Sequence, residues 1–548
     1  MKRKAWIVLL SLLCACVLTS AENAGRAGFG NIKNDRFWHT VDGAPIYSQG
    51  GGIFRFPSPK DGRLRYYWYG VRYMGAEDYL KDPSVTVKAF RFRSVTCYSS
   101  DDLVNWTFEG DVFTRDDITR AGSDPDGWVG RLGVAYVREI GRYALFVQHV
   151  SAASKNGESV LVVLGKSPAG RFEWHNWFTM RDMIGTPNTG DQTVFTDEDT
   201  GRSYLVYSYG RGRNKIYLSE IGMKDGKVGL LDCHQVFKGA GREGNCMFKY
   251  KGKYYMCASD LYGWDASHAY YLVADSIYGP YLPENRMLVM EGCSADYAHV
   301  TQTGFFVTVR GSKQETVVYC GDRWADFAGN GLGYNQWVPL SFQGETPFFN
   351  SLSSWDLNVS TGEWRVADDN DYVANGSFEA DRRPVPNPVK PRQDWLSGWK
   401  TEVLKGSPVS FDPQLSPRLN HLNTAEDRRQ VTGEKSLCIS DRVPFVRRVS
   451  QEISSTPYCT LPDGNYTVRL KVNVKGKFKA LRLSVESGGR VSRKDMGRAA
   501  AGKWSDIVLE GVRVRGGKAV LSVYADGKAG ATCLIDDVSM LRDMKEGR

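Results

Sequence analysis

The chain has 548 residues, of which 42% are hydrophobic and 24% charged, and its formal net charge is +9. This length exceeds one ordinary domain and predicts two or three. Lys and Arg are scattered along the sequence rather than gathered in basic runs, which argues against a nucleic-acid-binding protein. The 12% of aromatic residues and the 58 glycines favour strands joined by tight turns.

The N-terminal segment predicts an export signal over residues 1–21. A basic start, MKRK, precedes the apolar run AWIVLLSLLCACVLTS, which is too short for a comfortable membrane span. Within it, LCAC resembles a bacterial lipobox and would make Cys16 the lipidated first residue; ordinary cleavage after Ala21 is the alternative. The sequence therefore predicts a lipoprotein in the periplasm or at the outer membrane surface. The lipid would be its sole membrane anchor, because no later segment is apolar enough to cross a bilayer.

Cysteine spacing gives no signature of a metal site. Beyond Cys14 and Cys16 the chain has nine cysteines, an odd number without CxxC pairs. We expect mostly buried free thiols rather than a disulfide framework. Cys233 and Cys246 are the one candidate pair for a disulfide.

Residues 31–370 predict a five-bladed β-propeller. Five segments share one pattern, a short apolar strand, a polar turn and an aromatic-rich strand, as in CMFKYKGKYYMCASD. Their equivalent points are Tyr67, Tyr143, Tyr204, Tyr254 and Val318, with spacings of 76, 61, 50 and 64 residues. One hairpin cannot bury its apolar face alone, whereas blades packed around an axis can. The repeat thus favours a propeller over an array of β-sandwiches.

Two further segments of this region carry predictions. WDLNVSTGEWRVADDN is expected to supply the last propeller strand. Helical signals are weak, and FTRDDITRAG is the best candidate for a short helix, with a loop as the alternative.

Residues 372–548 predict a second domain, which contains the proline-rich boundary insertion EADRRPVPNPVKPRQDW near its start. Apolar and polar residues alternate in RRVSQEI, GNYTVRLKVNVKG, ALRLSVES, KWSDIVLEGVRV and AVLSVYADG, which Gly and Asp turns separate. This pattern is typical of a jelly-roll-like β-sandwich. The fold class expected for the whole chain is therefore all-β.

Two blade starts resemble motifs of glycoside hydrolase family 43, a family of inverting glycosidases with five-bladed propellers. TGDQTVFTDEDTGRSYLVYS is similar to the blade start whose Asp tunes the pKa of the acid, which here is Asp191. REGNCMFKYKGKYYMCAS is similar to the one that carries the general acid, which here is Glu243. Inversion itself needs a carboxylic acid at the leaving oxygen and a base about 6.5–9.5 Å away that activates water. A neighbouring carboxylate helps the acid to hold its proton, although each residue alone also fits an ordinary turn acid.

The first blade lacks the Asp that serves as base in most of the family. At that position YSQGGGIFRF has Gln49 and three glycines. This start resembles the exo-β-1,3-galactanase branch, in which a Gln of the fifth blade takes the base position, and AHVTQTGFFVTV places Gln302 there. An amide could act by positioning water or as an imidic acid, and a buried Gln that satisfies backbone groups is the alternative.

The second blade also departs from that branch. WVGRLGV places Gly130 and Arg131 where those galactanases carry a Glu that contacts substrate. The resemblance therefore fits release of galactofuranose or arabinofuranose at least as well as release of β-1,3-linked galactopyranose. Sugar recognition is expected from aromatic faces and hydrogen-bonding groups near the axis. The predicted substrate-binding residues are Trp264, Asp265, Asp322, Arg323, Trp324, Arg131 and Gln49.

The second domain resembles sandwich carbohydrate-binding modules. Its opening NGSFE and closing IDDVS would bring Glu379 close to Asp536 or Asp537 if the first and last strands pair. Carboxylates so placed suit a structural Ca²⁺, and solvated turn acids are the alternative. No cofactor is expected for the chemistry.

The predicted function is an exported, inverting, exo-acting glycosidase. Its expected products are galactose, as furanose or pyranose, or arabinofuranose, released from polysaccharide side chains such as those of arabinogalactan. Because the first-blade Asp is missing, a non-catalytic glycan-binding propeller is the alternative. The presence of both Glu243 and Asp191 favours the enzyme.

Overall fold

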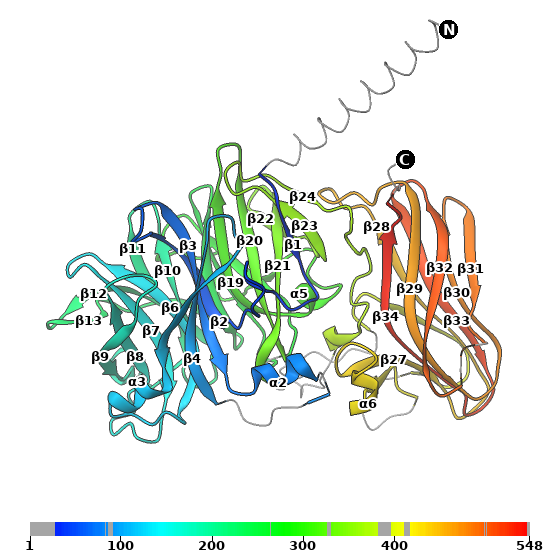
Figure 1. Cartoon of the computed structure of the whole chain (residues 1–548), viewed down its shortest axis with the longest axis horizontal. Coiled ribbons are helices and arrows are strands. Elements are labelled where there is room, and N and C mark those ends of the chain that lie inside the picture. The colour runs from blue at the N-terminus through cyan, green and yellow to red at the C-terminus, as the bar shows by residue number, and fades with distance from the viewer. Residues whose placement is uncertain are drawn as a thin grey trace, which may run out of the picture.

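The computed structural model describes residues 28–82, 84–85, 91–263, 265–325, 330–381, 396–409, 417–497, 499 and 501–544. A ring of β-sheets lies on one side and a two-sheet domain on the other (Figure 1). The predicted signal segment with Cys16 and most of the proline-rich boundary lie outside the described residues. Within the described ranges, no helix has the length and apolarity needed to cross a membrane.

Five antiparallel sheets surround a common axis and confirm the predicted five-bladed propeller. Each innermost strand contacts that of the next blade, and β19 closes the ring against β2. The blades are β2 (Gln49–Pro57), β3 (Leu64–Tyr73), β4 (Phe92–Ser100) and β5 (Thr107–Thr114); β6 (Trp128–Val137), β7 (Arg142–Val150), β8 (Val160–Gly165) and β9 (Phe172–Phe178); β10 (Thr189–Asp197), β11 (Arg202–Tyr209), β12 (Lys215–Lys224), β13 (Lys227–Leu230) and β14 (His234–Lys238); β15 (Glu243–Tyr250), β16 (Lys253–Ser259), β17 (Tyr270–Ala274) and β18 (Leu288–Val289); β19 (Gln302–Arg310), β20 (Glu315–Ala325), β21 (Asn330–Gln343) and β22 (Thr346–Phe349).

The five predicted hairpins form the first two strands of the five blades. Their residues are buried on both faces, because each blade packs between two neighbours, so they read as continuous apolar and aromatic runs. Trp68 and Tyr69 are completely buried in the first blade.

The ring closes between the first and last blades without a shared strand. β23 (Ser354–Leu357) and β24 (Trp364–Val366) pair with β1 (Gly30–Lys33) in a separate three-stranded sheet, so the prediction that this segment supplies the last propeller strand is wrong. Trp355 of this sheet shares an apolar cluster with Trp68 of the first blade. Side-chain packing, rather than a main-chain ladder, therefore joins the sheet to the ring.

Helices are short and lie in the connections. They are α2 (Ala76–Lys81), α3 (Arg115–Arg120), α4 (Arg181–Ile184), α5 (Tyr297–Val300), α6 (Ala425–Arg428) and the 3₁₀ turn η1 (Glu379–Asp381). α3 confirms the predicted short helix and begins with a capping box between Thr114 and Asp117. The residues of α5 have φ between 46° and 61°, so α5 is a left-handed turn.

The C-terminal domain is the predicted β-sandwich. One sheet has the order β25 (Lys400–Lys405), β28 (Phe445–Ser454), β33 (Lys518–Gly527), β30 (Phe478–Ser487), β31 (Arg490–Asp495); the other has the order β26 (Asn420–Leu422), β27 (Lys435–Ser440), β34 (Thr532–Arg542), β29 (Gly464–Lys475), β32 (Trp504–Val514). Alternate residues of both sheets meet in one core. The nine cysteines of the described residues are free thiols, Cys233 and Cys246 included.

Candidate active site

Every innermost strand of the propeller has a β-bulge near its start. A bulge inserts one extra residue and re-aims the side chains around it. Glycine is required at these points. Gly244 has a φ of +60°, and a Cβ there would lie 2.3 Å from the carbonyl oxygen of Thr303. The five bulges therefore gather side chains from five blades at one end of the ring.

The strand registers show which site residues are equivalent. Gln49, Glu243 and Gln302 each lie three residues before the first paired residue beyond the bulge, which is Gly52, Cys246 and Phe305 in turn. Asp191 lies inside its bulge, at the position that Arg131 has in the second blade. Gln49, Glu243 and Gln302 are thus equivalent positions of three blades. Asp191 and Arg131 are equivalent positions of two others.

Glu243 and Asp191 are buried neighbours. The backbone N–H of Gly244 donates to Asp191 Oδ2 at 2.7 Å, so the residue next to Glu243 holds Asp191 directly. Arg213, from the turn between β11 and β12, binds Oε2 of Glu243 and lies 3.5 Å from Oδ1 of Asp191. One guanidinium therefore links the two carboxylates.

Arg131 connects the rest of the cluster. Its side chain is 7% exposed and donates to Asp322 Oδ2 at 2.8 Å and to Gln302 Oε1 at 2.7 Å. Its Nε lies 3.5 Å from Asp191 Oδ2. Asp322 is paired across the hairpin with Gln302 and also accepts the N–H of Gly50 at 3.2 Å. These contacts unite blades one, two, three and five around one guanidinium.

The two predicted catalytic carboxylates, Glu243 and Asp191, have pKa values shifted in opposite directions. Burial and the charge of Asp191 raise the pKa of Glu243 to about 8, against the opposing effect of Arg213. Burial also acts on Asp191, but Arg213 and Arg131 outweigh it and lower its pKa. At neutral pH Glu243 therefore holds a proton beside an ionised Asp191, the arrangement that a general acid needs.

Removing the negative charge of Asp191 and removing the positive charge of Arg213 should move the pKa of Glu243 in opposite directions. Asp191→Asn removes a charge that raises the pKa of Glu243, whereas Arg213→Gln removes one that lowers it. If Glu243 acts as the acid, activity falls as pH rises through its pKa. We expect the alkaline limb of kcat/KM to move down by about one pH unit in Asp191→Asn and up by about one in Arg213→Gln. Shifts in the same direction would contradict this account.

The remaining predicted substrate-binding residues are placed as follows. Gln49 is buried at the start of β2 and donates to Asn335 at 3.3 Å. Asp265 is buried in the loop after β16, two residues from Gly263, whose carbonyl accepts the amide N–H of Gln302 at 3.1 Å. Trp264 and the side chain of Trp324 lie outside the described residues.

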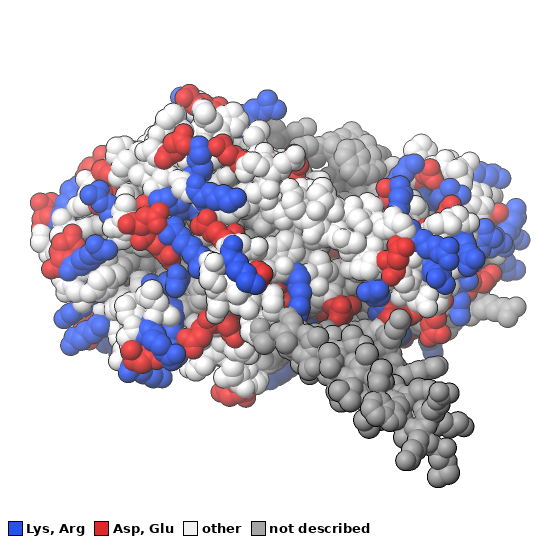
Figure 2. Space-filling model, turned by 90° about the horizontal axis from the view of Figure 1, so that it is seen from above, with Lys and Arg blue, Asp and Glu red and all other residues white. Residues whose placement is uncertain are grey.

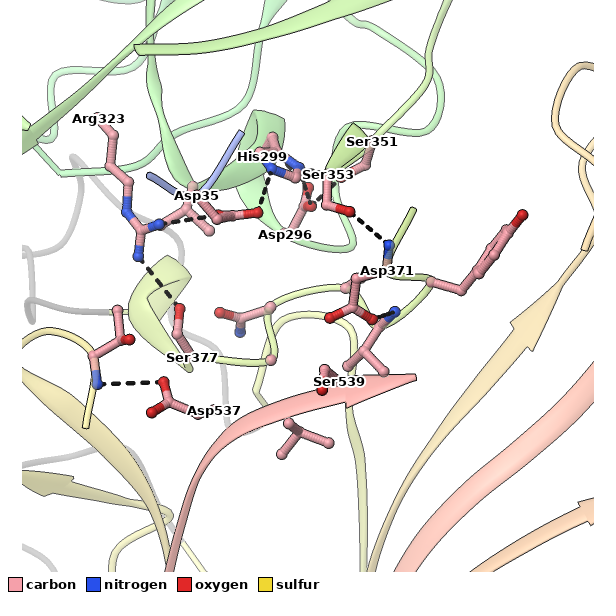
Figure 3. Close-up of a pocket in the computed structure, with 18 residues that line it drawn as sticks. Asp35, Asp296, His299, Arg323, Ser351, Ser353, Asp371, Ser377, Asp537 and Ser539 are labelled. Atoms are coloured by element: carbon pink, nitrogen blue, oxygen red, sulfur yellow. Dashed lines mark hydrogen bonds and ion pairs between the residues drawn. The ribbon is translucent and has the colours of Figure 1, made fainter. Parts of the chain in front are cut away.

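Arg323 does not lie with this cluster. Its side chain leaves β20 on the opposite side from Asp322 and lines a cavity of about 340 Å³ between the propeller and the sandwich (Figure 3). There it contacts Asp35 at 3.1 Å and Ser377 at 3.3 Å. The alternation of side chains along a strand separates Arg323 from its neighbour, so the predicted substrate contact becomes a contact between the domains.

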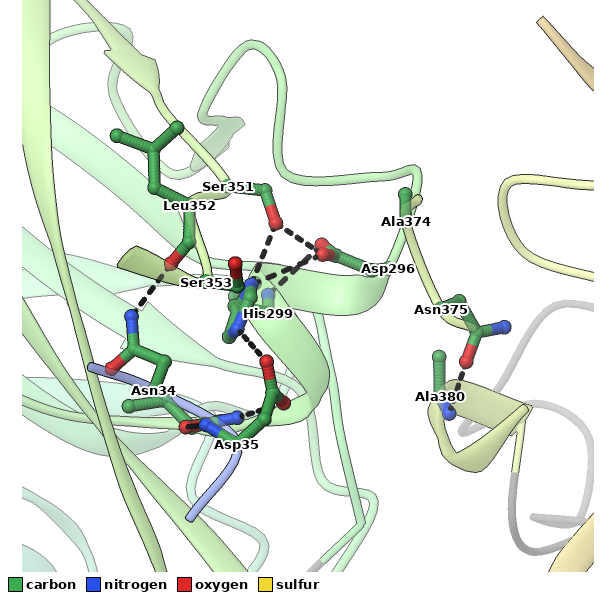
Figure 4. A network of polar contacts seen from close by, with 12 residues as sticks. Asn34, Asp35, Asp296, His299, Ser351, Leu352, Ser353, Ala374, Asn375 and Ala380 are labelled. Carbon is green, nitrogen blue, oxygen red and sulfur yellow. Dashed lines mark hydrogen bonds and ion pairs between the residues drawn. The ribbon is translucent and has the colours of Figure 1, made fainter. Parts of the chain in front are cut away.

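The same cavity is bordered by the left-handed turn α5, which ends two residues before Gln302. His299 of this turn lies between Asp35, at 3.1 Å, and Ser351, at 2.7 Å, and Asp296 is 3.4 Å from the same ring (Figure 4). Burial opposes a charge on His299, but the two carboxylates outweigh it and raise its pKa to about 10. A left-handed turn costs about 1–2 kcal/mol per residue, so this ion-paired ring anchors a strained backbone.

The predicted calcium ligands lie only partly together. Glu379 and Asp536 are fully buried. Glu379 accepts from the Lys435 N–H at 2.7 Å, and Asp536 accepts from the Ser436 hydroxyl at 2.9 Å and the Asp537 N–H at 2.8 Å. Burial, Asp537 and Glu379 raise the pKa of Asp536. Asp537 accepts from Thr432 and lines the inter-domain cavity.

Strand pairing does not bring these acids together, because residues 375–380 form a turn beside β34. Across the described ranges, no group of three His, Cys, Asp or Glu side chains is arranged to hold a metal.

Sequence reasoning missed Arg213. It lies in a turn, YGRGRNK, whose basic residues look like ordinary solvated turn residues. Electrostatics could have predicted a cation here, because two buried acids on adjacent blades are stable as carboxylates only with a positive charge nearby.

Comparisons with known proteins bear on the family and the fold. Residues 79–333 match the sequence model of the family described as Glycosyl hydrolases family 43. The exo-β-1,3-galactanase from Phanerochaete chrysosporium, solved with β-1,3-galactotriose, is 20% identical, with a TM-score of 0.52 over 93% of this chain and 99% of that one. An exo-β-1,3-galactanase from Clostridium thermocellum is 18% identical, with a TM-score of 0.52 over 92% and 99%. No curated protein matches the sequence. The two structures share the fold of this chain.

Proposed function

We propose that this glycosidase, which belongs to glycosyl hydrolases family 43 through residues 79–333, is an exported, inverting exo-enzyme. Its proposed products are galactose, as furanose or pyranose, or arabinofuranose, from the side chains of a polysaccharide such as arabinogalactan. The observation that carries the proposal is a buried Glu243 whose pKa is raised to about 8 beside an ionised Asp191. The structural neighbours named as exo-β-1,3-galactanases support a galactose-containing substrate.

In this mechanism Glu243 protonates the leaving glycosidic oxygen. Its side chain is 6% exposed, so little water competes for the proton. After the bond breaks, Glu243 is left as a carboxylate, and Arg213, already bound to Oε2, stabilises the new charge. Burial and the charge of Asp191 hold the pKa of Glu243 high before the transfer.

Gln302 takes the base position as a water-positioning amide. Its oxygen accepts from Arg131 at 2.7 Å, and its nitrogen donates to the Gly263 carbonyl at 3.1 Å. An imidic acid would carry a proton on the oxygen, facing the N–H of Arg131, so this geometry opposes that tautomer. Gln302 also hydrogen-bonds the side chain of Glu243, so a bound sugar must first separate the two side chains. Water positioned by Gln302 would then attack the sugar on the face opposite Glu243, which gives inversion.

The test is to incubate the mature protein with arabinogalactan and with aryl galactofuranosides, galactopyranosides and arabinofuranosides. We expect one monosaccharide, released from chain ends with inverted anomeric configuration, as followed by NMR. Release of internal fragments, or retention of configuration, would overturn the proposal. Failure to hydrolyse any of the substrates would also overturn it.

We also propose that the sandwich binds glycan and holds a structural Ca²⁺ at Glu379 and Asp536. Two fully buried carboxylates that repel each other fit a divalent cation, which would offset their charge. We expect Ca²⁺ to raise the melting temperature of the sandwich and EGTA to lower it, by several degrees. Glu379→Gln should abolish the response, whereas Glu452→Gln, an exposed matched change, should keep it. A calcium response that survives Glu379→Gln would exclude this site.

A further inference from the structure

The net charge of the chain resides in its C-terminal part. Residues 396–548 contain 27 Lys and Arg against 17 Asp and Glu, a formal charge of +10, whereas the whole chain carries +9. These cations are dispersed in the sequence, but the fold gathers many of them over the end of the molecule that the sandwich forms (Figure 2). The rest of the chain is close to neutral.

One sheet of the sandwich has a hollowed outer face. The hollow measures about 510 Å³ and is lined by residues of β25, β28, β33, β30 and β31 alone. Of these strands, β30, β31 and β33 lie at the end of the molecule away from the propeller (Figure 1). We call this hollow the basic trough, for the cations Lys400, Arg448, Arg482 and Arg493 that line it.

The floor of the basic trough is a row of small hydroxyl side chains. Ser450, Ser522 and Ser484 stand directly opposite one another on three adjacent strands, and the row ends in Lys400 on one side and Arg493 on the other. Adjacent strands are about 4.8 Å apart, so the serines span about 10 Å. Because serine is small, this row lies lower than its neighbours and forms a channel across the strands.

The row of residues beside the serines forms one wall of the basic trough. In it, the ring of Tyr524 has a positively charged side chain on each side. Tyr524 stands between Arg448 and Arg482, each of which is directly opposite it on a neighbouring strand. Glu402 accepts from Lys400 at 3.1 Å and lies 3.5 Å from Arg448. Within the part of the chain that the structure describes, Arg482 and Arg493 are exposed and form no ion pair. Two guanidinium groups are thus available to a ligand.

We propose that the basic trough binds an acidic polysaccharide whose negative charges are uronate carboxylates. Guanidinium groups bind carboxylates through two parallel hydrogen bonds. The serine row and the Tyr524 hydroxyl can hydrogen-bond sugar hydroxyls along the channel. With a single aromatic ring, Tyr524, the trough offers too little stacking surface for nucleobases.

Glycan binding by the basic trough rests on the proposed function and extends it to a class of ligand. The experiment measures binding and does not depend on hydrolysis. The full-length protein is titrated with polygalacturonate by calorimetry, with a neutral galactan, heparin and duplex DNA as comparisons. We expect binding to polygalacturonate that weakens between about 0.05 and 0.5 M NaCl, and weaker binding to the other three. Hydrolysis of the aryl glycosides tests the enzyme separately, so either proposal can fail alone.

Variants separate a shaped site from net charge. Arg482→Gln with Arg493→Gln should weaken polygalacturonate binding by about tenfold or more. Arg469→Gln with Arg513→Gln removes the same charge from the other sheet and should change binding less than about twofold. Ser522→Tyr fills the channel without changing charge and should also weaken binding. Equal losses in both double variants, no binding by the wild type, or DNA or heparin binding as tightly as polygalacturonate would overturn the proposal.

Discussion

Replacing Glu243 with Gln should lower kcat/KM on unactivated glycosides by about 10² to 10⁴-fold, the usual contribution of a general acid. The amide keeps the shape of the side chain but cannot give up a proton to the leaving oxygen. An aryl glycoside with a very acidic leaving group needs little protonation, so its hydrolysis should suffer much less. The alkaline limb set by the Glu243 pKa of about 8 should also disappear.

A matched control is Glu139→Gln, which alters an exposed carboxylate in the turn between β6 and β7. This variant should keep the wild-type rate and pH profile. Circular dichroism and melting temperature should show that Glu243→Gln is folded. Wild-type turnover of unactivated substrates by folded Glu243→Gln would exclude Glu243 as the acid.

Replacing Arg131 with Met should destabilise the propeller by about 3–5 kcal/mol at pH 8. The side chain is buried between Asp322 and Asp191, and its removal would leave two buried carboxylates without this cation. Protonation removes their charge, so the loss should be smaller at pH 5. Denaturant unfolding of the propeller at the two pH values measures the difference.

The double variant Arg131→Met with Asp322→Asn distinguishes electrostatics from packing. If unpaired charge causes the loss, the second substitution should restore part of the stability that the first removes. Additive losses that do not depend on pH would show that Arg131 acts through packing. Arg131→Lys should recover stability only in part, because an ammonium group cannot donate to Asp322 and Gln302 in the fork geometry of Arg131.

The blades could be predicted from the sequence because burial dictates their composition. Each first hairpin is covered on both sides, so its apolar and aromatic residues recur with the repeat, and the five equivalent points fall in the second strands of five blades. In the sandwich, alternation marked β28, β29, β30, β32 and β33 for a similar reason. It missed β25 and β31, whose residues are largely exposed at the edges of a sheet.

The details of the site could not be predicted in the same way. Glu243 and Asp191 look equivalent in sequence, but a bulge offsets them, and bulges are a property of strand pairing that one chain does not display. Arg323 was predicted, together with Asp322, to bind the substrate, although neighbours in a strand point to opposite faces. Arg213 reaches the site from a turn whose residues carry no pattern.

The five bulges also have a consequence for how such a site can change over time. The glycine backbones fix the end of the ring, while the side chain three residues before the first paired residue beyond the bulge differs among blades one, four and five, as Gln49, Glu243 and Gln302 show. A single substitution at one of these positions alters the chemistry at the axis and leaves the blade packing intact. The fold thereby offers points of variation in the first, fourth and fifth blades, through which new specificities can arise without loss of the scaffold.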